Sequence, residues 1–140
     1  MEIAEKLLTL PSKNKRNMKR TIFTILLSFI VLGIQAQQKH ISYIKNDGGY
    51  YLVYDESGKK ICSVSESTVG EVVGWGSDFF VSFDGGWYKT YDLNGRKITA
   101  LSQSTVGKVI SVSSTTFTSE DGGWIKIYDR NGKKINTKSK

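Results

Sequence analysis

The stretch Asp84-Gly-Gly-Trp-Tyr-Lys-Thr-Tyr-Asp-Leu-Asn-Gly-Arg-Lys-Ile98 decides the fold, because close copies of it begin at Asp47 and at Asp121. The three copies are spaced by 37 residues. Repetition at such a period is typical of folds built from stacked or radially arranged supersecondary units. The sequence therefore predicts one small structural unit that is repeated three times along residues 40–140.

Each copy holds two turn sequences around a run of strand-forming residues. The first turn is Asp-Gly-Gly, in which glycine supplies the positive φ that tight hairpin turns need. The second turn, Asp92-Leu-Asn-Gly95 in the middle copy, suits a type I turn closed by a left-handed glycine. The residues between the turns, such as Tyr50-Tyr-Leu-Val-Tyr54, favour strands. Each unit is therefore predicted to contain antiparallel hairpins.

The unit is expected to have about four short strands, with Ser67-Thr-Val-Gly70 and Ser104-Thr-Val-Gly107 as linkers between units. The first copy lacks the opening strand, which leaves roughly 11 strands and no amphipathic helix after residue 36. A loop at Gly85-Gly86 opposes Asp84 with Trp87 and Phe80 with Tyr91. The same register opposes Tyr43 with Tyr54 and Phe117 with Tyr128, so that an aromatic cross-strand pair recurs in every unit.

Positions that stay apolar from copy to copy predict the core. Apolar residues also appear on both faces of some strands, which favours sheets that are covered on both sides. The predicted core columns are Tyr43/Phe80/Phe117, Tyr54/Tyr91/Tyr128, Ile61/Ile98/Ile135, Val69/Val106 and Val72/Val109.

The predicted fold class is an all-β antiparallel meander of three tandem four-stranded repeats, with units at about 40–68, 69–105 and 106–140. The units resemble propeller blades, but three blades are too few for an ordinary closed propeller. That architecture would need oligomerisation or another kind of closure. A curled open barrel and a pseudo-threefold, trefoil-like barrel remain as alternatives.

Residues 18–36 have the three parts of a secretory signal peptide. Lys19 and Arg20 give the positive end, residues 21–34 are apolar, and Ala36 precedes the expected cleavage point. The apolar run is shorter than the roughly 20 residues that span a bilayer, so no stable membrane span is expected after cleavage. Met18 is the predicted start; the alternative is that residues 1–17 form a long extension at the positive end of the signal peptide. The mature domain, 37–140, is expected in the periplasm or outside the cell.

The formal net charge of +7 is unevenly distributed. Six basic and two acidic residues precede residue 37, which leaves a net charge of +3 on residues 37–140. That value is ordinary for an exported domain, and no nucleic-acid partner is expected. Cys62 and His40 are the only cysteine and the only histidine. They offer little for nucleophilic catalysis, and the sequence predicts no catalytic residues, no metal site and no cofactor.

The run Gly86-Trp87-Tyr-Lys-Thr-Tyr-Asp92-Leu-Asn-Gly95-Arg-Lys-Ile98 resembles the WG-type β-repeat family. Units of that family carry a Gly-rich hairpin, a Trp, an Asp-x-x-Gly-Lys turn and a β-branched residue. This chain departs from the pattern, because Gly precedes the Trp and Tyr50 takes its place in the first copy. The resemblance covers nearly all of residues 40–140. It implies repeated β-units of a kind often found in exported bacterial proteins, and it implies no particular enzyme activity.

The column Tyr50/Trp87/Trp124 is the predicted ligand-binding site. Aromatic rings spaced by a repeat can stack on sugars or other flat ligands, although such rings also serve as packing residues. The Asp-x-Asn-Gly turns offer too few oxygens for calcium. Asp47, Asp84 and Asp121 could act together as acids only if the fold gathered them. Basic pairs follow each second turn and form either a solvated rim or a contact for anionic polymers; these are Lys59-Lys60, Arg96-Lys97 and Lys133-Lys134.

These features predict an exported, non-enzymatic protein with a binding or structural role at the bacterial cell envelope. Its partner is expected to be a protein or a glycan. The alternative function is a lectin-like module that holds carbohydrate on Tyr50, Trp87 and Trp124. Burial of those rings would exclude the alternative, whereas rings that line a groove would favour it.

Overall fold

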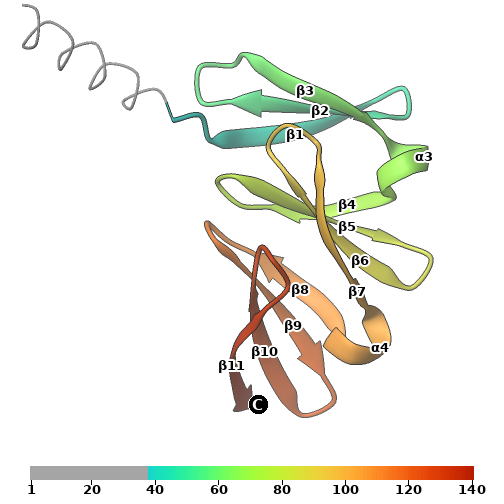
Figure 1. The fold of residues 1–140 in the computed structure, drawn as a ribbon, viewed down its shortest axis with the longest axis vertical. Coiled ribbons are helices and arrows are strands. Elements are labelled where there is room, and N and C mark those ends of the chain that lie inside the picture. Colours follow the sequence, from blue (N-terminus) through green and yellow to red (C-terminus); the bar gives the residue numbers. More distant parts are fainter. Residues whose placement is uncertain (1–37) are drawn as a thin grey trace, which may run out of the picture. The chain divides into compact units, whose positions relative to one another are not determined.

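A computed structural model describes residues 38–140, and the predicted signal peptide and start at Met18 lie outside this range. The described chain is all-β and forms three antiparallel sheets, as predicted from the repeats (Figure 1). These sheets form no closed barrel, so the open arrangement replaces the trefoil alternative. The unit that starts at Lys39 is described here by itself.

Eleven strands follow one another in the described chain, with each sheet ordered as in the sequence. The first sheet contains β1 (Ile41–Asp47), β2 (Tyr50–Asp55) and β3 (Lys60–Ser65). The second contains β4 (Glu71–Trp75), β5 (Phe79–Asp84), β6 (Trp87–Asp92) and β7 (Lys97–Ser102). The third contains β8 (Lys108–Val112), β9 (Thr116–Asp121), β10 (Trp124–Asp129) and β11 (Lys134–Ser139).

The predicted hairpin register is confirmed in all three sheets. Asp84 pairs with Trp87 and Phe80 pairs with Tyr91. The aromatic rings of each pair stack, with centroids 4.6 Å apart for Tyr43 and Tyr54. The corresponding separations are 5.1 Å and 5.3 Å in the second and third sheets. The two-glycine loops therefore fix which residues face one another.

Two one-turn helices connect the sheets, where only linkers were predicted. They are α3 (Glu66–Val69) and α4 (Gln103–Val106), and each carries one buried valine at its end. Four residues are too few to show a helical period, which is why the pattern Ser-Thr-Val-Gly did not reveal them. The glycine that follows α3, Gly70, has a positive φ of 88° and directly precedes β4.

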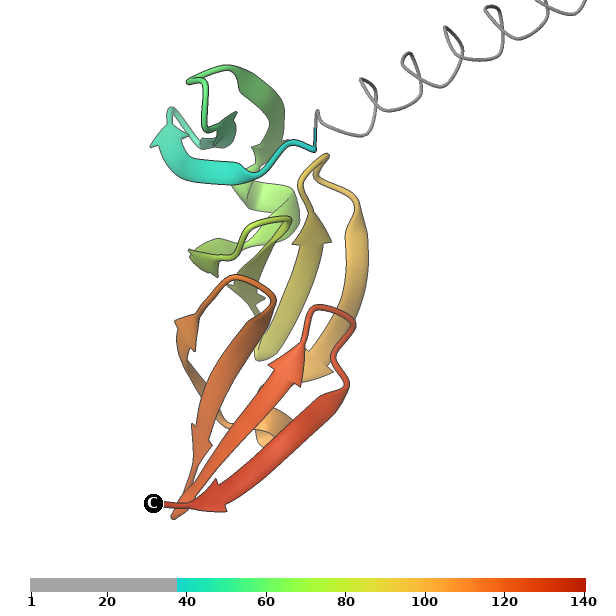
Figure 2. The ribbon, with the colours of Figure 1, turned by 90° about the vertical axis from the view of Figure 1, so that its left-hand side faces the viewer.

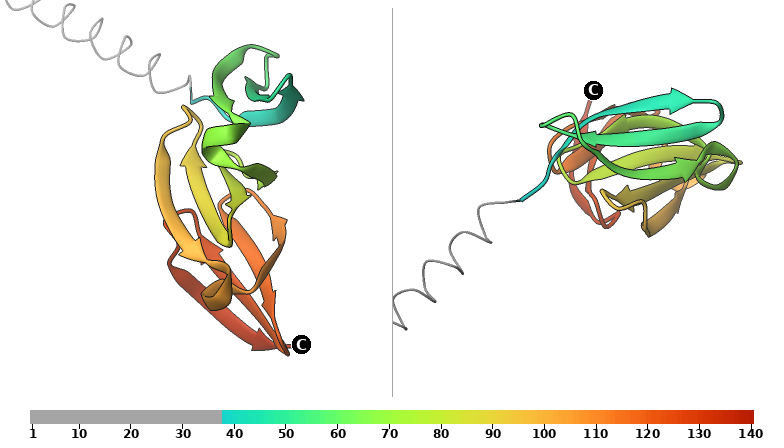
Figure 3. Two further views of the ribbon diagram at one scale, coloured as in Figure 1. Left: turned by 90° about the vertical axis from the view of Figure 1, so that its right-hand side faces the viewer. Right: turned by 90° about the horizontal axis from the view of Figure 1, so that it is seen from above.

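The three sheets stack as layers in chain order, and a separate core fills each of the two spaces between them (Figures 2 and 3). Alternation along β5 sends Phe80 into the first core and Phe79 and Val81 into the second. All three side chains are fully buried. The second sheet is therefore covered on both faces, as the apolar pattern predicted.

The predicted core columns hold wherever a neighbouring layer covers them. They are wrong at the two ends of the stack, because Tyr43 is 42% exposed and Ile135 is 54% exposed. Their equivalents Phe80 and Phe117 are fully buried, and Ile61 and Ile98 pack against the cores. Tyr43 faces away from the second sheet, and no described layer covers Ile135.

Candidate functional site

The predicted site residues occupy the same position in each layer. Tyr50, Trp87 and Trp124 are the first residues of β2, β6 and β10, directly after the Gly-Gly turns. Their exposed fractions are 54%, 49% and 53%. Each layer therefore presents one half-exposed ring at its Gly-Gly hairpin turn, and these three residues are called the aromatic column below.

Local sequence explains why these rings stay accessible. Side chains alternate along a strand, so Trp87 points to the same face of its sheet as Lys89 and Tyr91. Tyr91 lies in the middle of the strand and is buried in the first core. Trp87 begins the strand at the hairpin turn, where the preceding layer covers it only in part.

The connecting helices lie beside the column. The backbone N–H of Glu66 in α3 donates to the carbonyl of Gly49, and that of Gln103 in α4 donates to the carbonyl of Gly86. Each distance is 2.9 Å. These bonds hold the start of each helix next to the turn that carries the ring, on the right-hand side of Figure 1.

Lysines pair with the turn aspartates in all three layers, most closely in the second and third layers. Lys89 Nζ lies 2.7 Å from Asp84 Oδ2, and Lys126 Nζ lies 2.6 Å from Asp121 Oδ2. The hydrogen bond to Asp84 raises the pKa of Lys89, and the bond to Asp121 raises the pKa of Lys126. The three turn aspartates belong to three different sheets, so the fold does not gather them into one acidic site.

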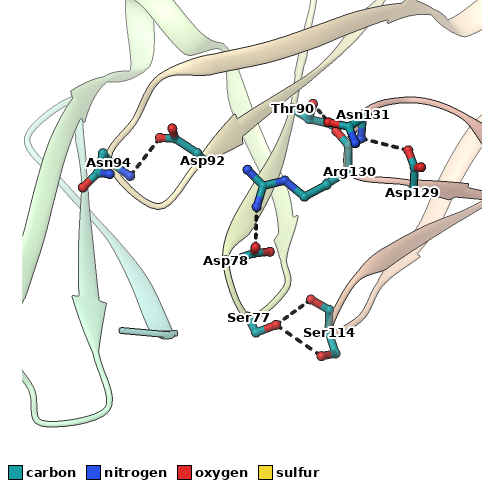
Figure 4. A network of polar contacts seen from close by, with 9 residues as sticks. All are labelled: Ser77, Asp78, Thr90, Asp92, Asn94, Ser114, Asp129, Arg130 and Asn131. Atoms are coloured by element: carbon teal, nitrogen blue, oxygen red, sulfur yellow. Dashed lines mark hydrogen bonds and ion pairs between the residues drawn. The ribbon is translucent and has the colours of Figure 1, made fainter. Parts of the chain in front are cut away.

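In the Asp-x-Asn-Gly turns, the aspartate carboxylate accepts hydrogen bonds from backbone N–H groups of the same turn. Asp92 Oδ1 accepts hydrogen bonds of 2.9 Å from the N–H groups of Asn94 and Arg96. Asp129 Oδ1 does the same in the third layer, toward Asn131 and Lys133 (Figure 4). Within residues 38–140, no three acidic, His or Cys side chains gather in a way that could hold a metal ion.

Asp55 shows the strongest version of this turn. Its Oδ1 accepts from the hydroxyl of Ser57 at 2.6 Å and from the N–H groups of Ser57 and Lys59 at 2.9 Å. The Ser57 hydroxyl, followed by the Lys59 N–H, lowers the pKa of Asp55 below its usual value. These bonds stabilise the charged carboxylate within the turn.

The Cys62 thiol forms its hydrogen bond with the backbone rather than with His40. The Cys62 thiol donates to the backbone carbonyl of Leu93 across the first layer interface, at 3.3 Å. Burial, assisted by the negative charge of Asp92, raises the pKa of Cys62. A raised pKa keeps the thiol protonated and weakly nucleophilic.

The basic pairs lie at the opposite strand ends from the aromatic column. The pairs follow the turns β2–β3, β6–β7 and β10–β11, and all six side chains are exposed. None of the six forms an ion pair with a carboxylate of the described chain. Because Asp55, Asp92 and Asp129 sit in the same turns, the local excess of positive charge is small.

A polar network between the second and third layers was not predicted (Figure 4). Arg130 forms an ion pair with Asp78, and Ser77 donates from its N–H and hydroxyl to the carbonyl of Ser114 at 2.9 and 2.7 Å. Thr90 donates to the carbonyl of Arg130 at 2.8 Å. The available signal was a break in the repeat, because Ile41 and Leu93 hold the places of Asp78 and Arg130 one layer earlier.

Trp75 also has a specific contact. Its indole N–H donates to the carbonyl of Ser42 on β1 at 3.3 Å, and the residue is 38% exposed. Val112 holds the equivalent position one layer later, so this tryptophan is not a repeated feature. The contact satisfies a carbonyl on the edge of the first sheet that no described strand covers.

No helix in the described part of the chain has the length and apolar character that crossing a membrane requires. Comparison of the chain with models of known protein families, with characterised proteins and with solved structures gave no match.

Proposed function

We propose that this chain is an exported, non-enzymatic WG-type repeat protein that binds a partner at the bacterial cell envelope through its aromatic column. One observation carries the proposal: Tyr50, Trp87 and Trp124 are half exposed at equivalent positions, one in each layer. Leaving large aromatic side chains in water forgoes the stabilisation of burial, roughly 1.5–3 kcal/mol for a large apolar side chain. A binding role explains why all three layers keep such a ring.

A protein partner at the envelope is the first candidate ligand. Aromatic residues are enriched at protein interfaces, where a ring contributes a large contact area at small entropic cost. The stacked layers set the spacing of the rings, since packed sheets lie about 10 Å apart. The partner would therefore be a surface or an extended segment that follows the stack.

A glycan is the second candidate, because the rings are exposed and so remain accessible to a sugar. The rings lie on successive layers, so they can contact separate sugars along one chain. The turn residues beside Trp87 and Trp124 offer Asp84 and Asp121, already paired with lysines, as polar neighbours. Such a mixture of ring faces and polar groups suits the faces and hydroxyls of a sugar.

The decisive experiment titrates the purified, exported chain with a panel of cell-wall and capsular polysaccharides while tryptophan fluorescence is recorded. A glycan ligand should shift the emission, and the shift should be lost in Trp87→Ala and Trp124→Ala. Trp75→Ala is the matched control, because Trp75 is exposed but lies outside the column. The Trp75→Ala chain should bind the glycan with the same affinity as the parent chain.

Without a fluorescence change, the same variants would be used to capture partners from envelope extracts. Loss of one specific protein with Tyr50→Ala, Trp87→Ala and Trp124→Ala, but not with Trp75→Ala, would support the protein ligand. Equal capture by all four variants, together with no glycan binding, would contradict a role for the column.

A further inference from the structure

Each junction between layers joins two different faces. We call the face that carries the stacked aromatic pair the upper face of a layer, and the opposite face the lower face. The upper face of the second layer, with Phe80 and Tyr91, packs on the lower face of the first layer, with Tyr51 and Val53. The upper face of the third layer, with Phe117, packs in the same way on the second layer.

In the second and third layers, the Asp-x-Asn-Gly turn reaches onto the preceding layer. A Cβ added to Gly95 would lie 2.6 Å from Val64 Cγ1 on β3, so the turn presses directly against that strand. Gly132 sits in the same way against Thr99 and Leu101 on β7. The turn carbonyl accepts a bond from the layer above, from Cys62 to Leu93 and from Thr90 to Arg130.

One upper face and one lower face of the described stack remain uncovered. The first layer leaves the stacked Tyr43 and Tyr54 open, and Gly58, the equivalent of Gly95, has no atom within 4 Å of an added Cβ. The third layer leaves Ile135 open at 54% exposure, beside the half-buried Ile127. Both open faces hold members of the columns that form the core elsewhere.

The charged residues on the two open faces are complementary. Glu56 of the first layer stands where Leu93 and Arg130 contact the layer above. Lys138 of the third layer stands where Val64 and Leu101 receive the turn of the next layer. Joining these two faces would bring the carboxylate of Glu56 close to the ammonium group of Lys138.

Lys45, which replaces the serine of the other two layers, suits a junction between two separate chains. Ser82 and Ser119 donate at 2.5 Å to the carbonyls of Val69 and Val106, at the ends of the connecting helices. The first layer has Lys45 at this position, and that side chain is exposed. A connecting helix does not run between two separate chains, so the longer lysine can fill that space.

We propose that this chain assembles head to tail, with the upper face of the first layer of one copy against the lower face of the third layer of another. The contact would repeat the stacking that the chain already uses twice within itself. Because the two faces differ, the contact is heterologous, and such contacts produce open linear assemblies when they do not close into rings. This inference concerns the stack ends and does not depend on the ligand of the aromatic column.

Two blocked variants test the proposal. Tyr43→Lys obstructs only the open upper face, and Ile135→Lys obstructs only the open lower face; both side chains are exposed, so the fold should persist. The parent chain should gain mass with concentration in sedimentation velocity, and each variant alone should stay monomeric. An equimolar mixture should form 1:1 dimers and nothing larger, because one unblocked face remains on each partner.

Circular dichroism and thermal melting would verify that both variants fold, and Leu52→Lys on the same upper face replaces Tyr43→Lys if it does not. Trp124→Ala should leave assembly unchanged. If Ile135→Lys still dimerises by itself, the first layers pair face to face and the proposal is wrong. A parent chain that stays monomeric at every concentration would overturn it as well.

Charge exchange provides the second test. Glu56→Lys and Lys138→Glu should each weaken self-association about threefold or more, a change in the range measured for exposed ion pairs. The double variant, with both charges reversed, should recover the parent affinity. Single variants that associate as tightly as the parent would show that Glu56 and Lys138 do not meet.

Discussion

Gly70 fixes the point where the connecting helix α3 meets the second layer, because it lies directly against β5. It combines a φ of 88° with a position where an added Cβ would lie 2.5 Å from the Phe83 carbonyl oxygen and from Asp84 Cβ. Gly48 also has a positive φ, of 60°, but nothing lies within 4 Å of its added Cβ. The two glycines therefore separate backbone strain from steric exclusion.

Gly70→Ala should lower the free energy of unfolding by about 3 kcal/mol or more, because strain of ~1–3 kcal/mol adds to ~1–3 kcal/mol of overpacking. Gly48→Ala should cost only about 1–2 kcal/mol, the penalty for a left-handed alanine. Urea unfolding of both variants measures the difference. Equal losses would mean that the close contact at Gly70 relaxes without cost.

Asp55 gives the chain a pH-dependent turn. Its folded pKa is lowered chiefly by the Ser57 hydroxyl. A lowered folded pKa means that the stabilisation is complete above the ordinary carboxyl pKa near 4 and is lost as the pH falls through the folded value. Ser57→Ala should raise the pKa of Asp55, as measured by carbon NMR titration of its carboxyl group. Ser63→Ala, exposed on β3, should leave that pKa unchanged.

At the scale of elements, hairpins were predictable because their determinants are local. The Asp-Gly-Gly turn and the recurring aromatic pair were sufficient to place Asp84 opposite Trp87 and Phe80 opposite Tyr91. The repeat predicted that Val69 and Val106 are core residues, but it did not predict that they end the helices α3 and α4. The prediction that Tyr43 is buried was wrong, because the repeated aromatic position does not reveal whether another layer covers it.

The two layer junctions use different pairs at the same place. Asp78 and Arg130 form an ion pair between the second and third layers, and Oδ1 of Asp78 is buried without a partner. Ile41 and Leu93 hold the equivalent positions in the first junction and belong to its core. The apolar pair at one junction and the charged pair at the other favour the observed order of the layers. Exchanging two layers would place a charged residue opposite an apolar one and bury an unpaired charge.

Arg130→Leu should lower the free energy of unfolding by about 1–2 kcal/mol, less than for a fully buried pair because both side chains are about a third exposed. The double variant Asp78→Ile with Arg130→Leu copies the first junction and should recover the parent stability or exceed it. Thermal and urea unfolding of the three variants form a double-mutant cycle. An additive loss would rule out direct coupling between the two positions.

At the scale of the molecule, the sequence could not distinguish stacked layers from blades or a barrel. The distinguishing contacts join residues of different layers, such as the Tyr51 hydroxyl that accepts from the N–H of Val72 at 3.2 Å. Tyr88 and Val109 repeat that contact one layer later. The aromatic column was found by its period, but its exposure depends on how far one layer overhangs the next, which no pattern within a single layer specifies.

A linear stack should also unfold unevenly, because each layer contacts only its neighbours. The second sheet has both faces covered and holds the fully buried Phe79, Phe80 and Val81. The outer sheets each have one open face. Native-state hydrogen exchange should therefore be slowest for the amides of β5, with β3 and β11 among the fastest strands.

Paired core variants show whether the two junctions are independent. Phe117→Ala empties part of the second core, and Phe80→Ala does the same to the first; each should cost about 3–5 kcal/mol. Phe117→Ala should speed exchange mostly in β9 and β10, and Phe80→Ala mostly in β1 and β2. If either variant speeds exchange equally in all three sheets, the layers unfold as one cooperative unit. In that case an added copy at an open end would stabilise the whole chain, whereas independent junctions confine the effect of assembly to the layer that it covers.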